Sequence, residues 1–151
     1  MSGALLGFDL GEKRIGVAFV PAGTTIAFPV KTIEVRGREQ VLAQIQKLIL
    51  EHKAEKVVVG LPITLKGEMG IAAEKRAQEV EWYQSRLAVP VVMWDERLSS
   101  KEVERMLISA DVSRERRKEV IDQLAAQRIL QNYLDHQTRL ETSDQGPETI
   151  Q

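Results

Sequence analysis

Four acidic residues, Asp9, Asp95, Glu96 and Asp122, are the side chains of this sequence best placed to do chemistry. Asp9 lies inside the apolar run Leu5–Leu10, where burying its charge is costly without a partner or a cation. Asp95 and Glu96 directly follow another apolar run, and Asp122 stands in a helical pattern. Carboxylate oxygens with no Cys or His beside them suit Mg²⁺ or Mn²⁺. The pattern predicts a site for a divalent cation, built from separate elements.

Two cations held by such acids would cleave a phosphodiester. In two-metal sites the ions lie roughly 3.5–4 Å apart, and one activates the attacking water while the other stabilises the leaving oxygen. Convergence of the acids is an inference, because spacing along the chain does not demonstrate it. Each acid also has an ordinary interpretation. Asp9 could hydrogen-bond the turn that follows it, and Asp95 with Glu96 could lie in a solvated loop or near a helix N-terminus. Asp122 could pair with Lys118 one helical turn earlier.

Asp122 heads an apolar stripe on one helix. Residues 122, 126, 129 and 133 share a helical face, and the three that follow Asp122 on it are Ala126, Ile129 and Tyr133. If the helix begins at Ser113, Asp122 lies more than two turns inside it. The helix dipole is then too distant to account for a carboxylate at this position.

The elements that must position the acids alternate in type along the chain. Apolar runs, helical spacing and a Ser-x-x-Glu capping box predict strands, then strands alternating with helices. We expect strands over 5–11, 15–20, 26–35, 57–59 and 91–94, and helices over 38–52, about 71–87, from 99, and from 113 to about 135. Pro29 favours a sheet edge for the third strand. The order predicts one three-layer α/β domain, with a mixed five-stranded sheet and helices on both faces.

Composition excludes several function classes. The 151 residues include no Cys, which excludes disulfide scaffolds, thiolate zinc sites and a cysteine nucleophile and fits a reducing cytoplasm. No run approaches the roughly 20 apolar residues of a membrane span. With 21 basic and 22 acidic residues, any nucleic-acid surface must be a local patch. We expect residues 1–136 to form the domain and residues 137–151 a polar, disordered tail.

Four segments together resemble the motifs of the YqgF/RuvX family. They are Gly7–Ala18, Val59–Pro62 with Gly67 and Gly70 behind it, Asp95–Ser100, and Ile121–Ala126 continuing through Leu130–Leu134. The four stand in the family's order. One departure is that a Thr commonly occupies one of the last two positions of the third motif, where this chain has Ser99 and Ser100; the hydroxyl is retained.

The resemblance implies a ribonuclease-H-like fold related to Holliday-junction resolvases. It also implies that the catalytic and metal-binding acids are Asp9, Glu96 and Asp122, with Asp95 as a further candidate ligand. We expect Mg²⁺ or Mn²⁺ as the cofactor, with two ions bound. The residues that we expect to contact substrate are Lys13, Arg14, Arg97, Ser99 and Ser100.

Members of that family are described both as junction resolvases and as nucleases that mature the 5′ end of the small-subunit ribosomal RNA precursor. We expect RNA maturation, with junction resolution as the alternative. Resolution needs two cuts and hence a homodimer, and the sequence specifies no dimer interface. Two hypotheses from other function classes remain open. One is a non-catalytic nucleic-acid-binding protein. The other is an actin-like nucleotide-binding domain, whose opening hairpin also carries Asp-x-Gly but whose second lobe has no room in 151 residues.

Overall fold

The computed structural model describes residues 3–61, 71–95 and 120–137. Five strands form one sheet in the order β3-β2-β1-β4-β5. The elements are β1 (Ala4–Leu10), β2 (Arg14–Val20), β3 (Phe28–Glu34), α1 (Arg38–His52), β4 (Ala54–Leu61), α2 (Ile71–Gln84) and β5 (Val91–Asp95), followed by a C-terminal helix over residues 120–137. Strands β1, β2 and β3 pair antiparallel, whereas β4 runs parallel to both β1 and β5. The predicted mixed five-stranded sheet is confirmed.

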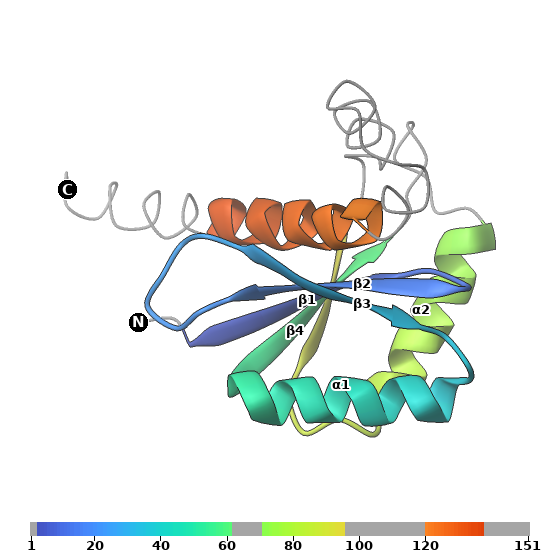
Figure 1. Cartoon of the computed structure of the whole chain (residues 1–151). Helices are drawn as coiled ribbons and strands as arrows, with labels where there is room; N and C mark the ends of the chain where they lie inside the picture. Colours follow the sequence, from blue (N-terminus) through green and yellow to red (C-terminus); the bar gives the residue numbers. More distant parts are fainter. Residues whose placement is uncertain (1–2, 62–70, 96–119, 138–151) are drawn as a thin grey trace, which may run out of the picture.

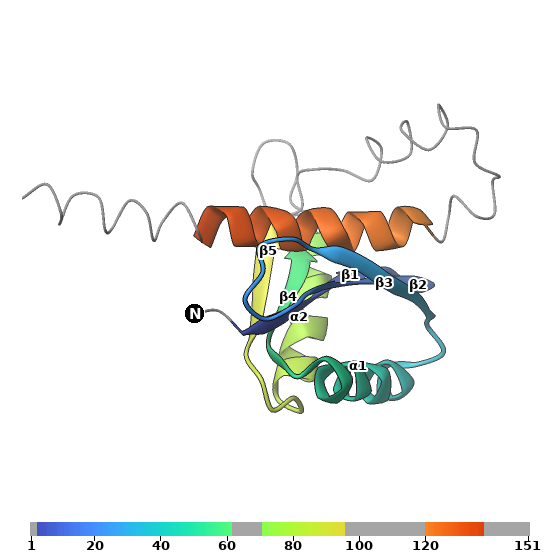
Figure 2. The ribbon, with the colours of Figure 1, turned by 60° about the vertical axis from the view of Figure 1, so that its left-hand side comes forward.

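Helices cover both faces of the sheet. Figures 1 and 2 show α1 on one side and the C-terminal helix, drawn in orange, on the other. Side chains of α1 and α2 share one buried core with the sheet, and those of the C-terminal helix share a second. The sheet is therefore the middle layer of three, as the element order predicts.

Strand β1 contributes to both cores, because successive residues of a strand point to opposite faces. The core beneath α1 and α2 receives three of its buried side chains, Leu6, Phe8 and Leu10. Leu5 lies in the other core, and Gly7 follows it on that face, against Leu130 of the C-terminal helix. Asp9 is the next residue of β1 on the same face.

The central strand β4 is buried on both sides. Val57 and Val59 lie in the core of α1 and α2, and Val58 lies in the core of the C-terminal helix. A run of β-branched residues without alternation is typical of such a strand. This confirms the predicted strand, which extends further at both ends than the three valines.

Several element boundaries differ from those predicted, among them the start of β3 and the end of α2. Strand β3 begins at Phe28 rather than at residue 26, and it forms one edge of the sheet, as Pro29 predicts. Helix α2 ends at Gln84 rather than near 87. The side chain of Gln84 connects the helix to the next strand, since its Oε1 accepts from the Val91 N–H at 2.6 Å and its Nε2 donates to the Val89 carbonyl at 3.2 Å.

The predicted helix starts at Ser99 and Ser113 and the predicted tail beyond residue 137 lie outside the described residues. Within the described ranges, no helix has the length and apolar character needed to cross a membrane.

Candidate active site

Asp9, Gly16 and Thr32 lie side by side on three neighbouring strands. Asp9 pairs with Gly16 between β1 and β2, and Gly16 pairs with Thr32 between β2 and β3. Directly opposed residues of antiparallel strands point to the same face. The three residues therefore form a row across the sheet, on the face covered by the C-terminal helix.

The C-terminal helix rests directly on Gly16. A Cβ atom at this position would overlap the carbonyl oxygen of Asp122 and would lie 2.9 Å from the backbone nitrogen of Gln123. Only glycine leaves room for the helix here. Because Asp9 is the cross-strand partner of Gly16, this close approach brings the segments that carry Asp9 and Asp122 together from opposite ends of the chain.

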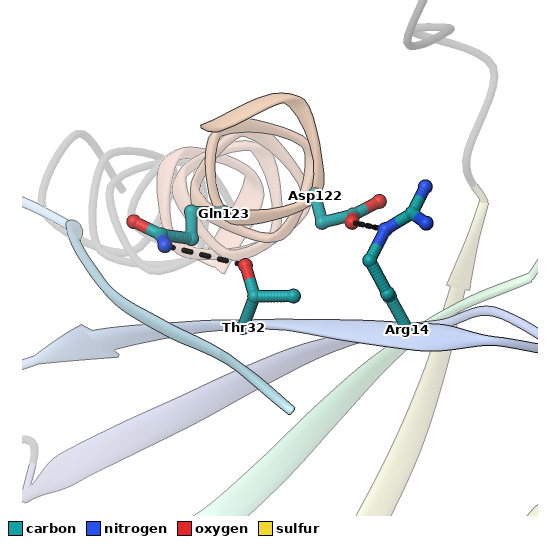
Figure 3. A network of polar contacts seen from close by, with 4 residues as sticks. All are labelled: Arg14, Thr32, Asp122 and Gln123. Atoms are coloured by element: carbon teal, nitrogen blue, oxygen red, sulfur yellow. Dashed lines mark hydrogen bonds and ion pairs between the residues drawn. The ribbon is translucent and has the colours of Figure 1, made fainter. Parts of the chain in front are cut away.

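An ion pair fixes Asp122 on the sheet. The Nε of Arg14, at the start of β2, donates to Oδ2 of Asp122 at 2.7 Å, and the side chains are 36% and 18% exposed. Figure 3 shows the terminal nitrogens of Arg14 extending past the carboxylate. The ion pair compensates a carboxylate that is largely removed from water. The alternative partner considered from the sequence, Lys118, lies outside the described residues.

A second polar contact joins the same two elements. The Nε2 of Gln123 donates to Oγ1 of Thr32 at 3.2 Å, on the other side of the helix from the Arg14–Asp122 pair (Figure 3). Sequence reasoning missed Gly16, Thr32 and Gln123 as positioning residues. A glycine inside a strand pattern is a signal for close backbone approach, so Gly16 could have been found. Thr32 and Gln123 carried no such signal.

Small residues let the helix cross the sheet closely. A Cβ added to Gly7 would lie 2.9 Å from the Cβ of Leu130, and Ala18 and Ala126 are fully buried between strand and helix. The rest of the predicted stripe is also buried, with Ile129 3% and Tyr133 4% exposed. The prediction that Asp122 heads an apolar face is confirmed.

The far part of the helix is held by aromatic and basic side chains. The rings of Trp94 in β5 and Tyr133 meet edge to face at 5.3 Å, and Nζ of Lys56 in β4 donates to the Tyr133 hydroxyl at 3.0 Å. The helix thus runs from β2, where Asp122 sits, to β4 and β5. These contacts fix the direction in which it carries Asp122 to the sheet.

The parallel strands bring a further acid to the same end of the sheet. Phe8 pairs with Val59, Gly60 with Trp94, and Leu61 with Asp95. Asp9, one residue beyond Phe8, and Asp95, one beyond Trp94, therefore both stand at the carboxyl ends of their strands, where open α/β sheets bind ligands. The other predicted site residues, Glu96, Arg97, Ser99 and Ser100, lie outside the described residues.

Asp9 and Asp122 fit a divalent cation by the chemistry of their oxygens. Across the described ranges no group of three acidic, His or Cys side chains forms a cation site. Glu96, the third acid that the sequence predicts, directly follows β5 in the chain. Lys13, predicted to contact substrate, lies exposed in the turn between β1 and β2.

Comparison with known proteins identifies the family. Residues 3–136 match the family described as RuvX, Holliday junction resolvase. The chain belongs to the RuvX family. A relative from Syntrophomonas wolfei, named "Putative pre-16S rRNA nuclease", is 48% identical over 132 residues, which cover 87% of this chain and 93% of the relative. A relative from Listeria monocytogenes serotype 4b with the same name is 48% identical over 134 residues, covering 87% and 96%.

Solved structures confirm the fold of this RuvX protein. It resembles RuvC of T. thermophilus, solved in complex with a Holliday junction substrate, with a TM-score of 0.55 and 14% identity over 91% of this chain and 96% of that one. It also resembles the Fowlpox virus resolvase, with a TM-score of 0.52 and 10% identity over 88% and 97% of the two chains. The predicted ribonuclease-H-like, resolvase-related architecture is thereby confirmed.

Proposed function

We propose that this chain is a metal-dependent nuclease that matures the 5′ end of the 16S ribosomal RNA precursor. One observation carries the proposal. The C-terminal helix brings Asp122 close to the row of Asp9, Gly16 and Thr32, at the carboxyl ends of parallel strands. That approach occurs in a chain whose relatives, at 48% identity, are named as pre-16S rRNA nucleases.

In this proposal the acids come from different segments of the chain and bind the same pair of cations. Asp9, Glu96 and Asp122 would hold Mg²⁺ or Mn²⁺, two ions in all, with Asp95 as a further candidate ligand. The ions would supply an activated water and stabilise the leaving oxygen. The products would carry 5′-phosphate and 3′-hydroxyl ends.

In this proposal the basic residues position the catalytic carboxylate and the substrate, and they do not react themselves. Arg14 holds the Asp122 carboxylate through Nε at 2.7 Å, which orients that carboxylate before any substrate arrives. Its other N–H donors remain suited to a phosphate, because a guanidinium offers several donors in one plane. The remaining substrate contacts would come from Lys13, Arg97, Ser99 and Ser100.

A cleavage assay on a pre-16S rRNA fragment tests the proposal. The wild type should cut it in Mg²⁺ or Mn²⁺ and not in EDTA. Asp9→Asn and Asp122→Asn should each lower the rate at least about a hundredfold, since even loss of an outer-shell residue costs about 10–100-fold. Asp135→Asn is the matched control, because Asp135 is exposed on the same helix. This variant should cleave the RNA like the wild type.

Mn²⁺ titration by calorimetry separates cation binding from turnover. The wild type should bind Mn²⁺ and Asp122→Asn should bind it much more weakly, with Asp135→Asn unchanged. RNA binding without cleavage in either metal, insensitive to Asp9→Asn and Asp122→Asn, would overturn the proposal in favour of a non-catalytic nucleic-acid-binding protein.

Junction resolution is the second candidate, favoured by the description of the family that matches residues 3–136. A resolvase makes two symmetric cuts and needs a homodimer. A four-way DNA junction should therefore be assayed beside the RNA, with sedimentation of the protein on the junction. Paired cuts by a dimer, with the RNA left intact, would replace RNA maturation by resolution.

A further inference from the structure

A cleft of about 610 Å³ lies on the opposite face of the sheet from the candidate active site. It is bounded by the turn between β1 and β2, the start of α1 and one side of α2, the side of the molecule where Figure 1 shows α1 and α2. Such a volume is typical of small-molecule sites. Neither Asp9 nor Asp122 lines the cleft, so it is separate from the proposed nuclease chemistry.

The interior of the cleft is apolar. Leu10, Ile15 and Val41 line it and belong to the buried core. Tyr83 lines it as well and is only 7% exposed. Burial, and then the Glu79 carboxylate, raise the pKa of the Tyr83 hydroxyl above its ordinary value of 10.0, and a tyrosine hydroxyl is in any case protonated and able to donate at neutral pH. The cleft is an apolar slot with a hydroxyl donor among its lining residues.

A tryptophan and an arginine in cation–π contact form part of the wall. The guanidinium carbon of Arg38 lies 4.5 Å from the ring centroid of Trp82, and both residues line the cleft. A guanidinium carries several N–H donors, so one held over an indole ring can also bind an anion. Arg86 also lies over Trp82, at 4.1 Å, but it does not line the cleft.

Two basic side chains, Arg38 and Lys75, line the cleft together with two acidic ones, Glu12 and Glu79. Within the described part of the chain, neither Arg38 nor Lys75 forms a salt bridge. Of the two acids that line the cleft, Glu79 pairs with Arg76 at 3.0 Å and Glu12 lies exposed in the turn. Two basic side chains that form no salt bridge with the described residues, beside apolar lining residues and an indole ring, suit a ligand that is planar and apolar at one end and anionic at the other.

We propose that this cleft binds a nucleoside phosphate, with the base in the apolar slot beside Trp82 and the phosphate on Arg38 and Lys75. A free nucleotide and a nucleotide of an RNA strand present the same chemistry to these residues. The inference goes beyond the proposed function, since it invokes neither a cation nor the catalytic acids. The cleft nevertheless shares the β1–β2 turn with the active site, where the Gly11 N–H donates to the Arg14 carbonyl at 3.0 Å.

Calorimetry in EDTA tests the proposal on the full-length protein, and EDTA keeps it independent of any metal site. The probes are AMP, GMP, adenosine, inorganic phosphate and a 5′-phosphorylated single-stranded RNA trinucleotide. We expect saturable binding of a mononucleotide, with adenosine and phosphate alone at least about tenfold weaker. Arg38→Gln should weaken binding at least about tenfold, because charged hydrogen bonds to the phosphate are lost. Lys75→Gln should weaken it severalfold.

The matched control is Arg86→Gln, which removes a guanidinium from the same indole ring without changing the lining of the cleft; it should bind like the wild type. If the trinucleotide binds with the same dependence on Arg38 and the mononucleotides do not, the ligand is a nucleotide of RNA. If Arg38→Gln fails to fold, the exposed Lys75→Gln variant decides. Absence of saturable binding to every probe, or binding that neither variant weakens, would overturn the proposal whatever the nuclease assay shows.

Discussion

The two faces of the sheet are built on different principles, although the same strands supply both. Towards α1 and α2 the strands present large aliphatic and aromatic side chains, such as Leu6, Phe8 and Val17. Towards the C-terminal helix β2 presents Gly16 and Ala18, with Arg14 at its start. The first face holds its helices at a distance set by side-chain volume. The second lets a helix backbone reach the strands and leaves room for an ion pair.

This difference explains why the candidate active site lies on the face of the C-terminal helix. A core filled by volume tolerates small rearrangements, but a catalytic acid must be placed to within a fraction of an ångström. Gly16 brings the backbone of Asp122 onto the sheet, and Arg14 then fixes the carboxylate. Close packing therefore supports the candidate active site, and apolar volume supports the fold.

The largest effect should come from filling the space above Gly16. In Gly16→Ala the new Cβ would overlap the Asp122 carbonyl, which is backbone and cannot rotate away. We expect a loss of about 3 kcal/mol in the free energy of unfolding, from overpacking, measured by urea denaturation. The displaced helix should also abolish Mn²⁺ binding and RNA cleavage in the fraction that remains folded.

Val17→Ala provides the comparison from the other face of the same strand. Val17 is fully buried under α1 and α2, and its truncation should lower stability by about 2 kcal/mol through a cavity. Because the C-terminal helix is not displaced, Mn²⁺ binding and cleavage should be retained. If Gly16→Ala and Val17→Ala lost cleavage equally, the two faces of the sheet would not differ in their importance for the candidate active site.

A smaller effect should follow from breaking the ion pair. Arg14→Gln removes the donor to Asp122, and because both side chains are partly exposed the stability loss should be only about 1 kcal/mol. Cleavage should nevertheless fall at least about tenfold, as expected when a residue that orients a metal ligand is lost. Urea denaturation and the rate on the RNA fragment measure the two quantities.

Arg36→Gln is the matched control for the ion pair, since it breaks the exposed pair of Arg36 with Glu34 at 3.7 Å. It should change neither the urea midpoint nor the rate. An Arg14→Gln variant that cleaves at the wild-type rate would show that Asp122 does not depend on Arg14 for its position.

Periodicity accounts for what the sequence predicted well. Helix α1 has the predicted bounds, and the stripe of Ala126, Ile129 and Tyr133 is buried, because each follows from the local spacing of apolar residues. The partner of Asp122 could not be obtained in this way. Arg14 and Asp122 are 108 residues apart, and their contact depends on how closely a helix approaches a strand, which local spacing does not encode.

The cleft was equally beyond prediction, since the start of α1, one side of α2 and the β1–β2 turn contribute to it together. Arg38 and Trp82, taken separately, look like surface residues of two amphipathic helices. Their contact follows from how α1 and α2 pack on the same core. Chemistry-bearing acids in apolar strands are visible in a sequence, whereas a site assembled from ordinary surface residues is not.

The smallest effect concerns Tyr83, whose pKa is raised on the face of the sheet that α1 and α2 cover. Burial and the Glu79 carboxylate raise the pKa of Tyr83 above its ordinary value of 10.0. Above pH 10 the unfolded chain loses this proton while the folded protein still holds it, so stability present below pH 10 is lost as the pH rises through the folded pKa. Tyr83→Phe lacks this dependence.

The unfolding free energies of the wild type and Tyr83→Phe, followed from pH 8 to 11 by urea denaturation, should differ by a constant up to about pH 10. The unfolding free energy of the wild type should then fall relative to that of the variant, because only the wild type has a group that ionises more readily in the unfolded chain than in the folded protein. Curves that stay parallel to pH 11 would mean that Tyr83 ionises as readily in the folded protein as in the unfolded chain. The Tyr83 hydroxyl would then be hydrated through the cleft that it lines, and at this position the face towards α1 and α2 would not be filled by side-chain volume.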